Sequence, residues 1–169
     1  MKRFLPLLFL FFYAAAYSQT QTSPQKAFSI GLDLAIPTNS IYSIGFGGSG
    51  KAEVPIVGAV SLTFTAGYTS LYFKSSLLGS AQSQQPSGFV PLKAGVKYYL
   101  SEGFYIEGEA GTSIETNYTK NKLFAFAVAP GFLLPINKNS AVDLGFRYEN
   151  WGNGRVRQTG IRAAYRISW

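Results

Sequence analysis

The chain of 169 residues is long enough for one domain, but only 14% of its residues are charged, whereas 16% are aromatic and 18 are glycine. Such a composition leaves too few charges to cover the surface of an ordinary soluble protein. The chain has no cysteine and no histidine, which excludes disulfides, a lipid anchor on cysteine and the usual general base at neutral pH.

The first 18 residues have the pattern of a secretory signal peptide. Lys2 and Arg3 form a positive head, residues 4–16 are almost wholly apolar, and small residues precede a predicted cleavage after Ser18. A transmembrane helix is the alternative, but it needs about 20 apolar residues, and this shorter run is followed by a polar stretch. We therefore predict a signal peptide over residues 1–18 and one β-barrel domain over residues 19–169.

Alternation of apolar and polar side chains predicts eight β-strands in the rest of the chain. In the first strand, Phe28, Ile30 and Leu32 alternate with Ser29 and Gly31. The predicted strands cover residues 28–36, 42–53, 60–68, 90–98, 104–110, 124–134, 142–149 and 161–169. No later stretch is as long and apolar as a membrane helix, so a chain that enters a bilayer must cross it as a closed barrel.

The connections between these strands alternate in length. Residues 101–103 and 137–139 fit tight hairpin turns, and Gly103 can supply a left-handed position in the first of them. The longer polar links are residues 70–88, 116–122 and 150–158. Short periplasmic turns and longer external loops are typical of membrane barrels. We therefore predict an all-β fold, an eight-stranded antiparallel up-and-down transmembrane β-barrel, with both termini on the periplasmic side.

Four parts of the sequence carry architectural motifs rather than catalytic ones. They are residues 98–105, 107–111 and 144–149 and the terminal aromatic Trp169. Together they resemble the small outer-membrane β-barrel family of Bacteroidota-type bacteria, a porin-like or OmpX-like group of eight-stranded barrels. The resemblance implies the fold and a location in the bacterial outer membrane, among lipid and lipopolysaccharide, but it says little about activity.

The last predicted strand ends on an aromatic residue. Its apolar parity consists of Ile161, Ala163, Tyr165, Ile167 and Trp169. This arrangement resembles the C-terminal assembly signal of bacterial outer-membrane barrels, which implies the barrel assembly machinery as a partner. If this parity faces lipid, Arg162 and Arg166 point into the lumen.

The opposite parity of the strands carries the charges that then point inward. They are Asp33, Lys51, Glu53, Lys93, Lys97, Glu107, Glu109, Asp143, Arg147, Glu149, Arg162 and Arg166. Six are basic and six are acidic, which favours internal ion pairing over an ion-selective pore. The hairpin at residues 101–103 places Lys97 opposite Glu107, with Glu109 diagonal to it, and predicts a cross-strand ion pair. Because eight strands enclose a lumen that side chains can fill, we expect a plugged barrel.

A soluble lipocalin-like barrel with the two faces reversed is the main alternative. Its exterior would be the parity rich in Gly, Ala, Ser and Thr, which is poor for a soluble surface. Two groups of aromatic residues near the strand ends favour the membrane barrel, because aromatic residues gather at both bilayer interfaces. One group is Phe28, Tyr98, Phe104 and Trp169, and the other is Tyr42, Tyr68, Tyr72, Tyr148 and Trp151.

Pro130 conflicts with a regular strand over residues 124–134. Proline lacks the backbone donor, and a closed barrel has no unpaired edge where that loss would be harmless. The sequence therefore predicts a β-bulge at Pro130.

Catalysis is not expected from this sequence. General acid–base chemistry near neutral pH usually relies on histidine, and the chain also lacks the histidine and cysteine ligands of a typical metal cluster. Glu107 and Glu109 form the only close carboxylate pair, and neutralisation of neighbouring lysines and arginines explains that pair better than acid–base catalysis. We predict no enzyme activity, no cofactor and no metal.

The predicted function is structural or interactive. Five basic residues of the long links are candidates for charge-assisted contacts to lipopolysaccharide phosphates, with a solvated loop as the alternative for each: Lys74, Lys120, Lys122, Arg155 and Arg157. Nucleic acid is excluded as a partner because the signal peptide exports the protein. We predict a monomeric outer-membrane barrel in envelope integrity, surface contact or adhesion. A narrow transport barrel for a small or apolar solute is the first alternative, and a soluble periplasmic carrier is the second.

Overall fold

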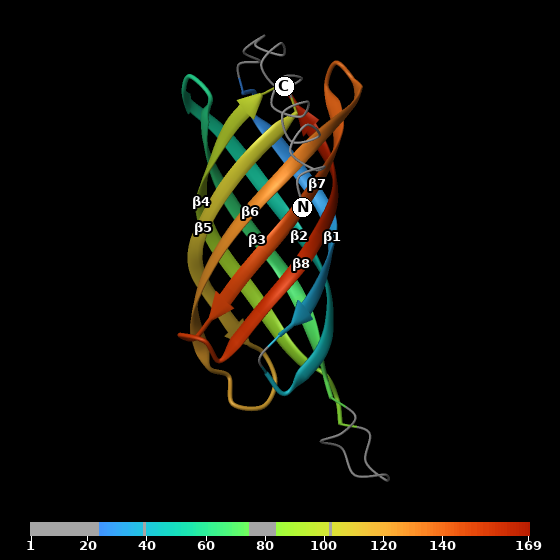
Figure 1. Ribbon diagram of the computed structural model, residues 1–169, viewed down its shortest axis with the longest axis vertical. Helices are drawn as coiled ribbons and strands as arrows, with labels where there is room; N and C mark the ends of the chain where they lie inside the picture. The colour runs from blue at the N-terminus through green and yellow to red at the C-terminus, as the bar shows by residue number, and fades with distance from the viewer. Residues whose placement is uncertain (1–23, 39, 75–83, 102) are drawn as a thin grey trace, which may run out of the picture.

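The computed structural model describes residues 24–38, 40–74, 84–101 and 103–169, so the predicted signal peptide lies outside the described residues. The strands are β1 (Ala27–Pro37), β2 (Tyr42–Val57), β3 (Val60–Phe73), β4 (Ser87–Ser101), β5 (Phe104–Glu115), β6 (Lys122–Asn137), β7 (Ser140–Trp151) and β8 (Val156–Ser168). Each strand pairs antiparallel with the next, and β8 pairs with β1, which closes the barrel (Figure 1). The predicted eight-stranded antiparallel barrel is confirmed. Among the described residues, no helix is long and apolar enough to cross a membrane.

The barrel has two different ends. The terminus end, where the chain begins β1 and finishes β8, carries the connections at residues 58–59, 102–103 and 138–139. Gly103 has the predicted positive φ, 79°. The opposite end, here called the loop end, carries the connections at residues 38–41, 74–86, 116–121 and 152–155 (Figure 1). The long link expected at residues 150–158 is wrong, because β7 and β8 extend toward each other and leave only a tight turn.

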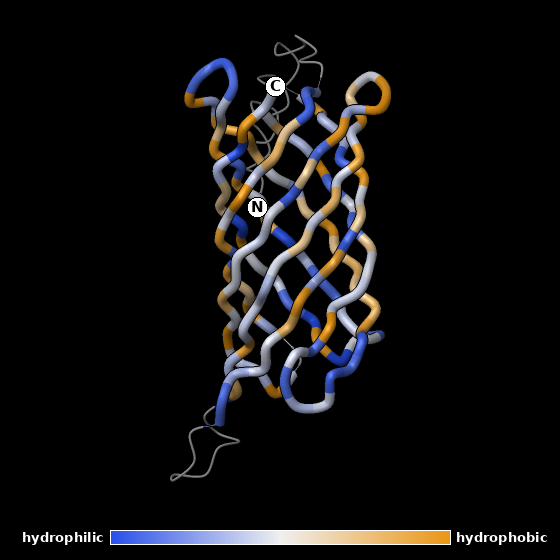
Figure 2. Tube along the Cα trace, turned by 180° about the vertical axis from the view of Figure 1, so that it is seen from behind, coloured by the Kyte–Doolittle hydropathy of each residue, from blue (hydrophilic) through white to orange (hydrophobic). Residues whose placement is uncertain are grey.

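Side chains alternate between the outside and the inside of the barrel along each strand. In β8, Ile161, Tyr165 and Ile167 are 44%, 46% and 48% exposed, whereas Arg162 and Arg166 are buried. Figure 2 shows polar and apolar residues that follow one another along the chain trace. The burial pattern is the reverse of a lipocalin-like barrel, since the apolar side chains lie outside and the charged ones inside.

The expected β-bulge at Pro130 is wrong. β6 and β7 keep one register on both sides of it, with Val128 opposite Tyr148 and Gly131 opposite Gly145, so the same number of residues is skipped on each strand. The ladder between β6 and β7 is interrupted there instead, because proline has no N–H to donate. The pairing of β6 with β5 is unbroken at the same position. The barrel therefore tolerates Pro130 by a local gap in one ladder.

Candidate functional site

All twelve charged residues that were predicted to face the lumen lie inside the barrel and take part in ion pairs. Seven of them form a chain of alternating charge. Its order is Glu107, Lys51, Glu109, Lys93, Glu149, Arg147 and Asp33. Lys51 Nζ lies 2.5 Å from Glu107 Oε2 and 3.3 Å from Glu109 Oε1. The chain crosses the lumen, because its members come from β1, β2, β4, β5 and β7.

The other five charged residues form a second chain in the lumen. Its order is Arg166, Glu53, Lys97, Asp143 and Arg162, with nitrogen–oxygen distances from 3.3 to 3.7 Å. Ser49 joins the two chains: its Oγ donates to Asp33 Oδ2 at 2.6 Å and accepts from Arg162 Nε at 2.9 Å. We call the twelve charged residues together with Ser49 the lumen charge network.

Neutral donors supplement the carboxylates of the lumen charge network. Thr65 Oγ1 donates to Glu109 at 2.5 Å, and Tyr105 Oη donates to Asp143 at 2.5 Å. Tyr99 Oη donates to Glu53 in the same way. Burial of a charge is costly unless it is paired and hydrogen-bonded, and these contacts reduce that cost for the three carboxylates.

The predicted Lys97–Glu107 ion pair is wrong, although the predicted register is right. Lys97 lies opposite Glu107 in the β4–β5 ladder, but its Nζ lies 3.3 Å from Glu53 and 3.6 Å from Asp143. Glu107 pairs with Lys51 instead. Because the sheet is closed, the long side chain of Lys97 can reach across the lumen to β2 and β7 instead of pairing with the adjacent strand β5.

The lumen near the loop end is filled by apolar side chains. This loop-end cluster consists of Tyr42, Leu71, Phe89, Ala125, Trp151 and Val156. The rings of Phe89 and Trp151 lie 5.3 Å apart, and Trp151 is only 1% exposed. The described residues thus place two layers of side chains in the lumen, the lumen charge network and the loop-end cluster.

Two residues of the predicted aromatic girdles lie in this cluster and not on the outer surface. Tyr42 turns inward because a register shift between Tyr42 and Ile44 reverses the parity at the start of β2. Trp151 has the inward parity of Asp143 and Glu149 on β7. The outer surface near the loop end keeps Tyr68, Tyr72 and Tyr148, which are 44% to 50% exposed.

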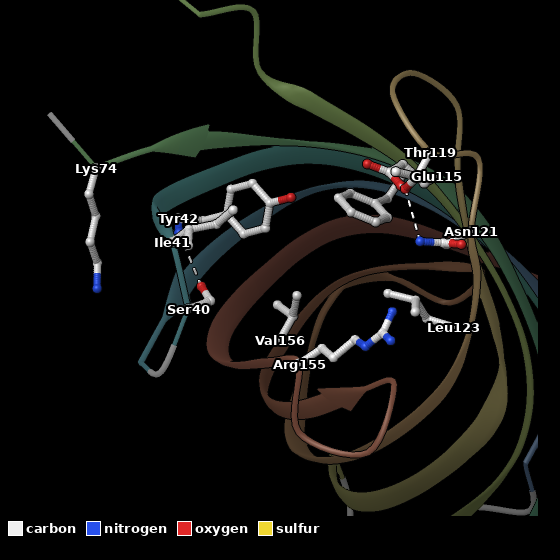
Figure 3. Close-up of a pocket in the computed structure, with 11 residues that line it drawn as sticks. Ser40, Ile41, Tyr42, Lys74, Glu115, Thr119, Asn121, Leu123, Arg155 and Val156 are labelled. Carbon is white, nitrogen blue, oxygen red and sulfur yellow. Dashed lines mark hydrogen bonds between the residues drawn. The ribbon is translucent and has the colours of Figure 1, made fainter. Parts of the chain in front are cut away.

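A pocket of about 450 Å³ opens at the loop end, directly above the loop-end cluster (Figure 3). Tyr42, Phe89 and Val156 of that cluster form its apolar floor. Its charged side chains are Lys74, Glu115 and Arg155, and its polar side chains are Ser40, Thr119 and Asn121. We call this cavity the mouth pocket.

One wall of the mouth pocket is held in place by hydrogen bonds. Asn117, in the link between β5 and β6, accepts from the Gly88 amide and donates to the Pro86 carbonyl, both at 2.8 Å. Tyr118 Oη donates to the Gln85 carbonyl at 2.6 Å. This link is therefore tied to the base of the neighbouring one, and the wall exists before any ligand arrives.

The five basic residues proposed as lipid-phosphate contacts fall into different places. Lys74 and Arg155 line the mouth pocket. Lys122 and Arg157 are exposed near the loop end and share the outward parity of β6 and β8. Lys120 is exposed in the link between β5 and β6, with a positive φ of 52°. Of the five, only Lys122 and Arg157 thus lie on the outward parity of a strand, and Lys120 lies in a link.

Glu115 is an inward-facing carboxylate that the sequence-based prediction did not include. The fifth strand was expected to end at residue 110, but β5 continues to Glu115 with the parity of Glu107 and Glu109. The residue is 8% exposed, and Thr119 Oγ1 donates a hydrogen bond to its carboxylate. Continuing the alternation beyond residue 110 would have identified it.

The carboxylates of the lumen are arranged for ion pairing. Glu107 and Glu109 are at most 2% exposed, and both lie beside Lys51. Within the described ranges, no group of three His, Cys, Asp or Glu side chains is placed to hold a metal ion. The mouth pocket, by contrast, is open to a ligand.

No known protein family and no curated protein matches the sequence. Solved structures do match the fold. Neisserial surface protein A is 14% identical with a TM-score of 0.63, covering 85% of this chain and 97% of that one. Ail, the attachment invasion locus protein of Yersinia pestis, is 14% identical with a TM-score of 0.56, covering 86% and 100%. A de novo designed transmembrane β-barrel is 14% identical with a TM-score of 0.51, covering 88% and 100%. At this identity the likeness establishes the fold alone.

Proposed function

We propose that this chain is an integral outer-membrane β-barrel with a filled lumen, and that its loop end contacts other molecules at the cell surface. The observation that carries the proposal is the reversed burial of the barrel. Ile30 and Leu32 are 65% and 75% exposed at the middle of β1, whereas Asp33 is buried beside them. Exposed apolar surface of this kind around a whole barrel is unsuited to water, and a bilayer would cover it.

The exposed aromatic residues support the same placement. Phe28, Tyr98 and Trp169 are exposed toward the terminus end, and Tyr68 and Tyr148 are exposed toward the loop end. Two such belts suit the two interfaces of a bilayer. The likeness to Neisserial surface protein A and Ail adds support, and it favours export by a signal peptide at residues 1–18.

A structural or interaction role is favoured over transport. The lumen charge network and the loop-end cluster occupy successive levels of the described lumen. The ion pairs also join side chains from strands on different sides of the barrel. Ail is named as an attachment protein, and a similar role in surface contact or adhesion is the proposal for this chain. The loop end then faces the outside, while the terminus end faces the periplasm.

The outward cations of the loop end are the proposed contacts to lipopolysaccharide. Lys122 and Arg157 project from the barrel wall beyond its apolar band, and Lys120 lies above them in a link. Lysine and arginine make charge-assisted hydrogen bonds to phosphate. Cations at the loop end of the barrel wall are expected to contact lipid phosphates in the outer leaflet.

Membrane fractionation and heat-modifiable gel migration test the barrel assignment. We expect the protein in the outer-membrane fraction, with different migration before and after boiling. In planar bilayers, the purified protein should give no large, stable conductance, because the lumen is filled. Retention in the soluble fraction after lysis would overturn the membrane assignment, and a large, stable conductance would favour the transport alternative.

The lipopolysaccharide contacts have a separate test. The double variant Lys122→Gln/Arg157→Gln should bind immobilised lipopolysaccharide more weakly than the natural protein, and added salt should reduce the difference. The matched control is Lys138→Gln, because Lys138 is exposed in the turn at the terminus end. Equal binding by the double variant and the natural protein would exclude these contacts.

A further inference from the structure

We propose that the mouth pocket binds a short zwitterionic peptide with apolar side chains. The pocket combines an apolar floor with charges of both signs. Its volume of about 450 Å³ lies within the range of roughly 300–1,000 Å³ that is usual for small-molecule sites. This binding goes beyond the proposed role in surface contact and does not depend on the lipopolysaccharide contacts.

The charged side chains of the mouth pocket, unlike those of the lumen charge network, form no ion pairs with other described residues. None of the ion pairs among the described residues includes Lys74, Glu115 or Arg155. The sequence of residues 75–83, which follows Lys74, contains no charged residue. The only acidic residue outside the described ranges is Glu102, whose neighbours lie at the terminus end.

Glu115 is the group that selects for a cation. Its side chain is nearly buried, and its only hydrogen-bond donor among the described residues is Thr119. A buried carboxylate without a counter-charge is costly, so a ligand ammonium group placed beside it gains a charge-assisted hydrogen bond. Asn121 lies on the same wall and is oriented by a 2.9 Å hydrogen bond to Thr119 (Figure 3).

Arg155 is the group that selects for an anion. Figure 3 shows its side chain running toward Leu123 and lying below Asn121, away from Glu115, with Lys74 on the other side beyond Tyr42. A guanidinium group suits a carboxylate because it presents paired donors in a planar fork. Opposite charges on one ligand would therefore meet Glu115 and Arg155 across the pocket.

The apolar floor of the mouth pocket is the reason why we propose apolar side chains on the ligand. Tyr42, Phe89 and Val156 present apolar surface to the pocket, and Leu123 adds to it from the start of β6. A single fatty acid would satisfy the floor and Arg155 but would leave Glu115 without a partner. A short peptide with a free amino group, a free carboxylate and apolar side chains satisfies all three features.

The test compares the dipeptide Leu-Phe with N-acetyl-Leu-Phe, Leu-Phe amide and octanoate, by calorimetry on the folded protein in lipid nanodiscs. We expect saturable binding of Leu-Phe and binding of each other compound that is weaker by about tenfold or more, since each lacks one charge-assisted contact. No saturable binding of Leu-Phe, or equal binding of the capped peptides or octanoate, would overturn the proposal.

Two variants assign the charged groups. Glu115→Gln should remove the preference for Leu-Phe over the acetylated peptide, and Arg155→Gln should remove the preference for Leu-Phe over the amide. The control is Lys138→Gln, because Lys138 is exposed in the turn between β6 and β7 at the terminus end, away from the mouth pocket. Unchanged preferences in folded Glu115→Gln and Arg155→Gln, verified by heat-modifiable migration, would contradict the assigned roles.

Discussion

Most buried charges of the lumen charge network have more than one partner. Lys93 Nζ lies between Glu109 and Glu149, and Glu149 also lies 3.4 Å from Arg147. Buried ion pairs gain little over apolar residues of the same volume, but removing one member leaves an uncompensated charge. The lumen charge network therefore specifies how the strands close more than it adds net stability.

Lys93→Met tests this dependence. The substitution leaves Glu109 and Glu149 with one cation fewer in a buried site, and we expect a loss of about 3–5 kcal/mol in the free energy of unfolding. Urea unfolding of the protein in lipid vesicles measures the loss. Adding Glu149→Gln to Lys93→Met should restore part of it, because one uncompensated carboxylate is removed.

The control for that experiment is Lys138→Met, in the exposed turn between β6 and β7. It should leave the unfolding midpoint unchanged, since surface substitutions away from paired groups have small effects. An equal midpoint for Lys93→Met and the natural protein would show that the ion pairs of Lys93 contribute nothing.

Sequence alone identified the twelve charged residues of the lumen charge network but missed Glu115, and it did not identify the partners of the twelve. Inward parity follows from alternation, which is local along each strand. The contacts of Lys97 with Glu53 and Asp143 cross the lumen, and they depend on the closure of eight strands and on the length of each side chain. Such partners are set by three-dimensional geometry rather than by neighbouring positions in the sequence.

At the level of strands, the alternation of inward and outward side chains continues beyond the strand ends that were predicted. Continued toward the loop end, the inward parity includes Leu71, Phe89, Glu115 and Trp151. Tyr42 is different, because the register shift next to it reverses its parity. A bulge leaves little trace in a sequence with Ser43 and Ile44 at that point, so the inward position of Tyr42 could not be predicted from alternation.

Pro130→Val tests the cause of the gap between β6 and β7. Valine supplies the missing N–H and suits a strand, and position 130 faces outward. We expect the variant to gain about 0.5–1.5 kcal/mol in the free energy of unfolding, with slower amide exchange in β7 around Phe146.

The control for Pro130→Val is Pro135→Val, because Pro135 lies near the end of β6, opposite Ala141 and next to a register shift. It should change exchange only near the turn. Unchanged or faster exchange around Phe146 in Pro130→Val would show that the proline is not the cause of the gap.

For the whole molecule, the central feature is an apolar outer surface around an interior of charges. The ion pairs join side chains across the lumen, and the outer surface of the strands is largely apolar. Its loop end differs from its terminus end, because only the loop end combines longer links, outward cations and the mouth pocket. The fold and the inward charges were predictable from alternation, whereas the mouth pocket required the arrangement of four links at one end.

Because the chain has no cysteine, single cysteines can report which face meets lipid. Ala163 is exposed on the outward parity of β8, Ala164 is 5% exposed on the inward parity, and Lys138 lies in an exposed turn. The most direct measurement is quenching of a fluorophore attached to Ala163→Cys or Lys138→Cys in lipid vesicles, by spin-labelled lipid chains and by aqueous iodide.

We expect spin-labelled lipid to quench the fluorophore at position 163 and iodide to quench it at position 138, while Ala164→Cys resists labelling until the protein unfolds. Quenching by iodide at position 163 as strong as at position 138, without quenching by lipid, would contradict a membrane-embedded barrel.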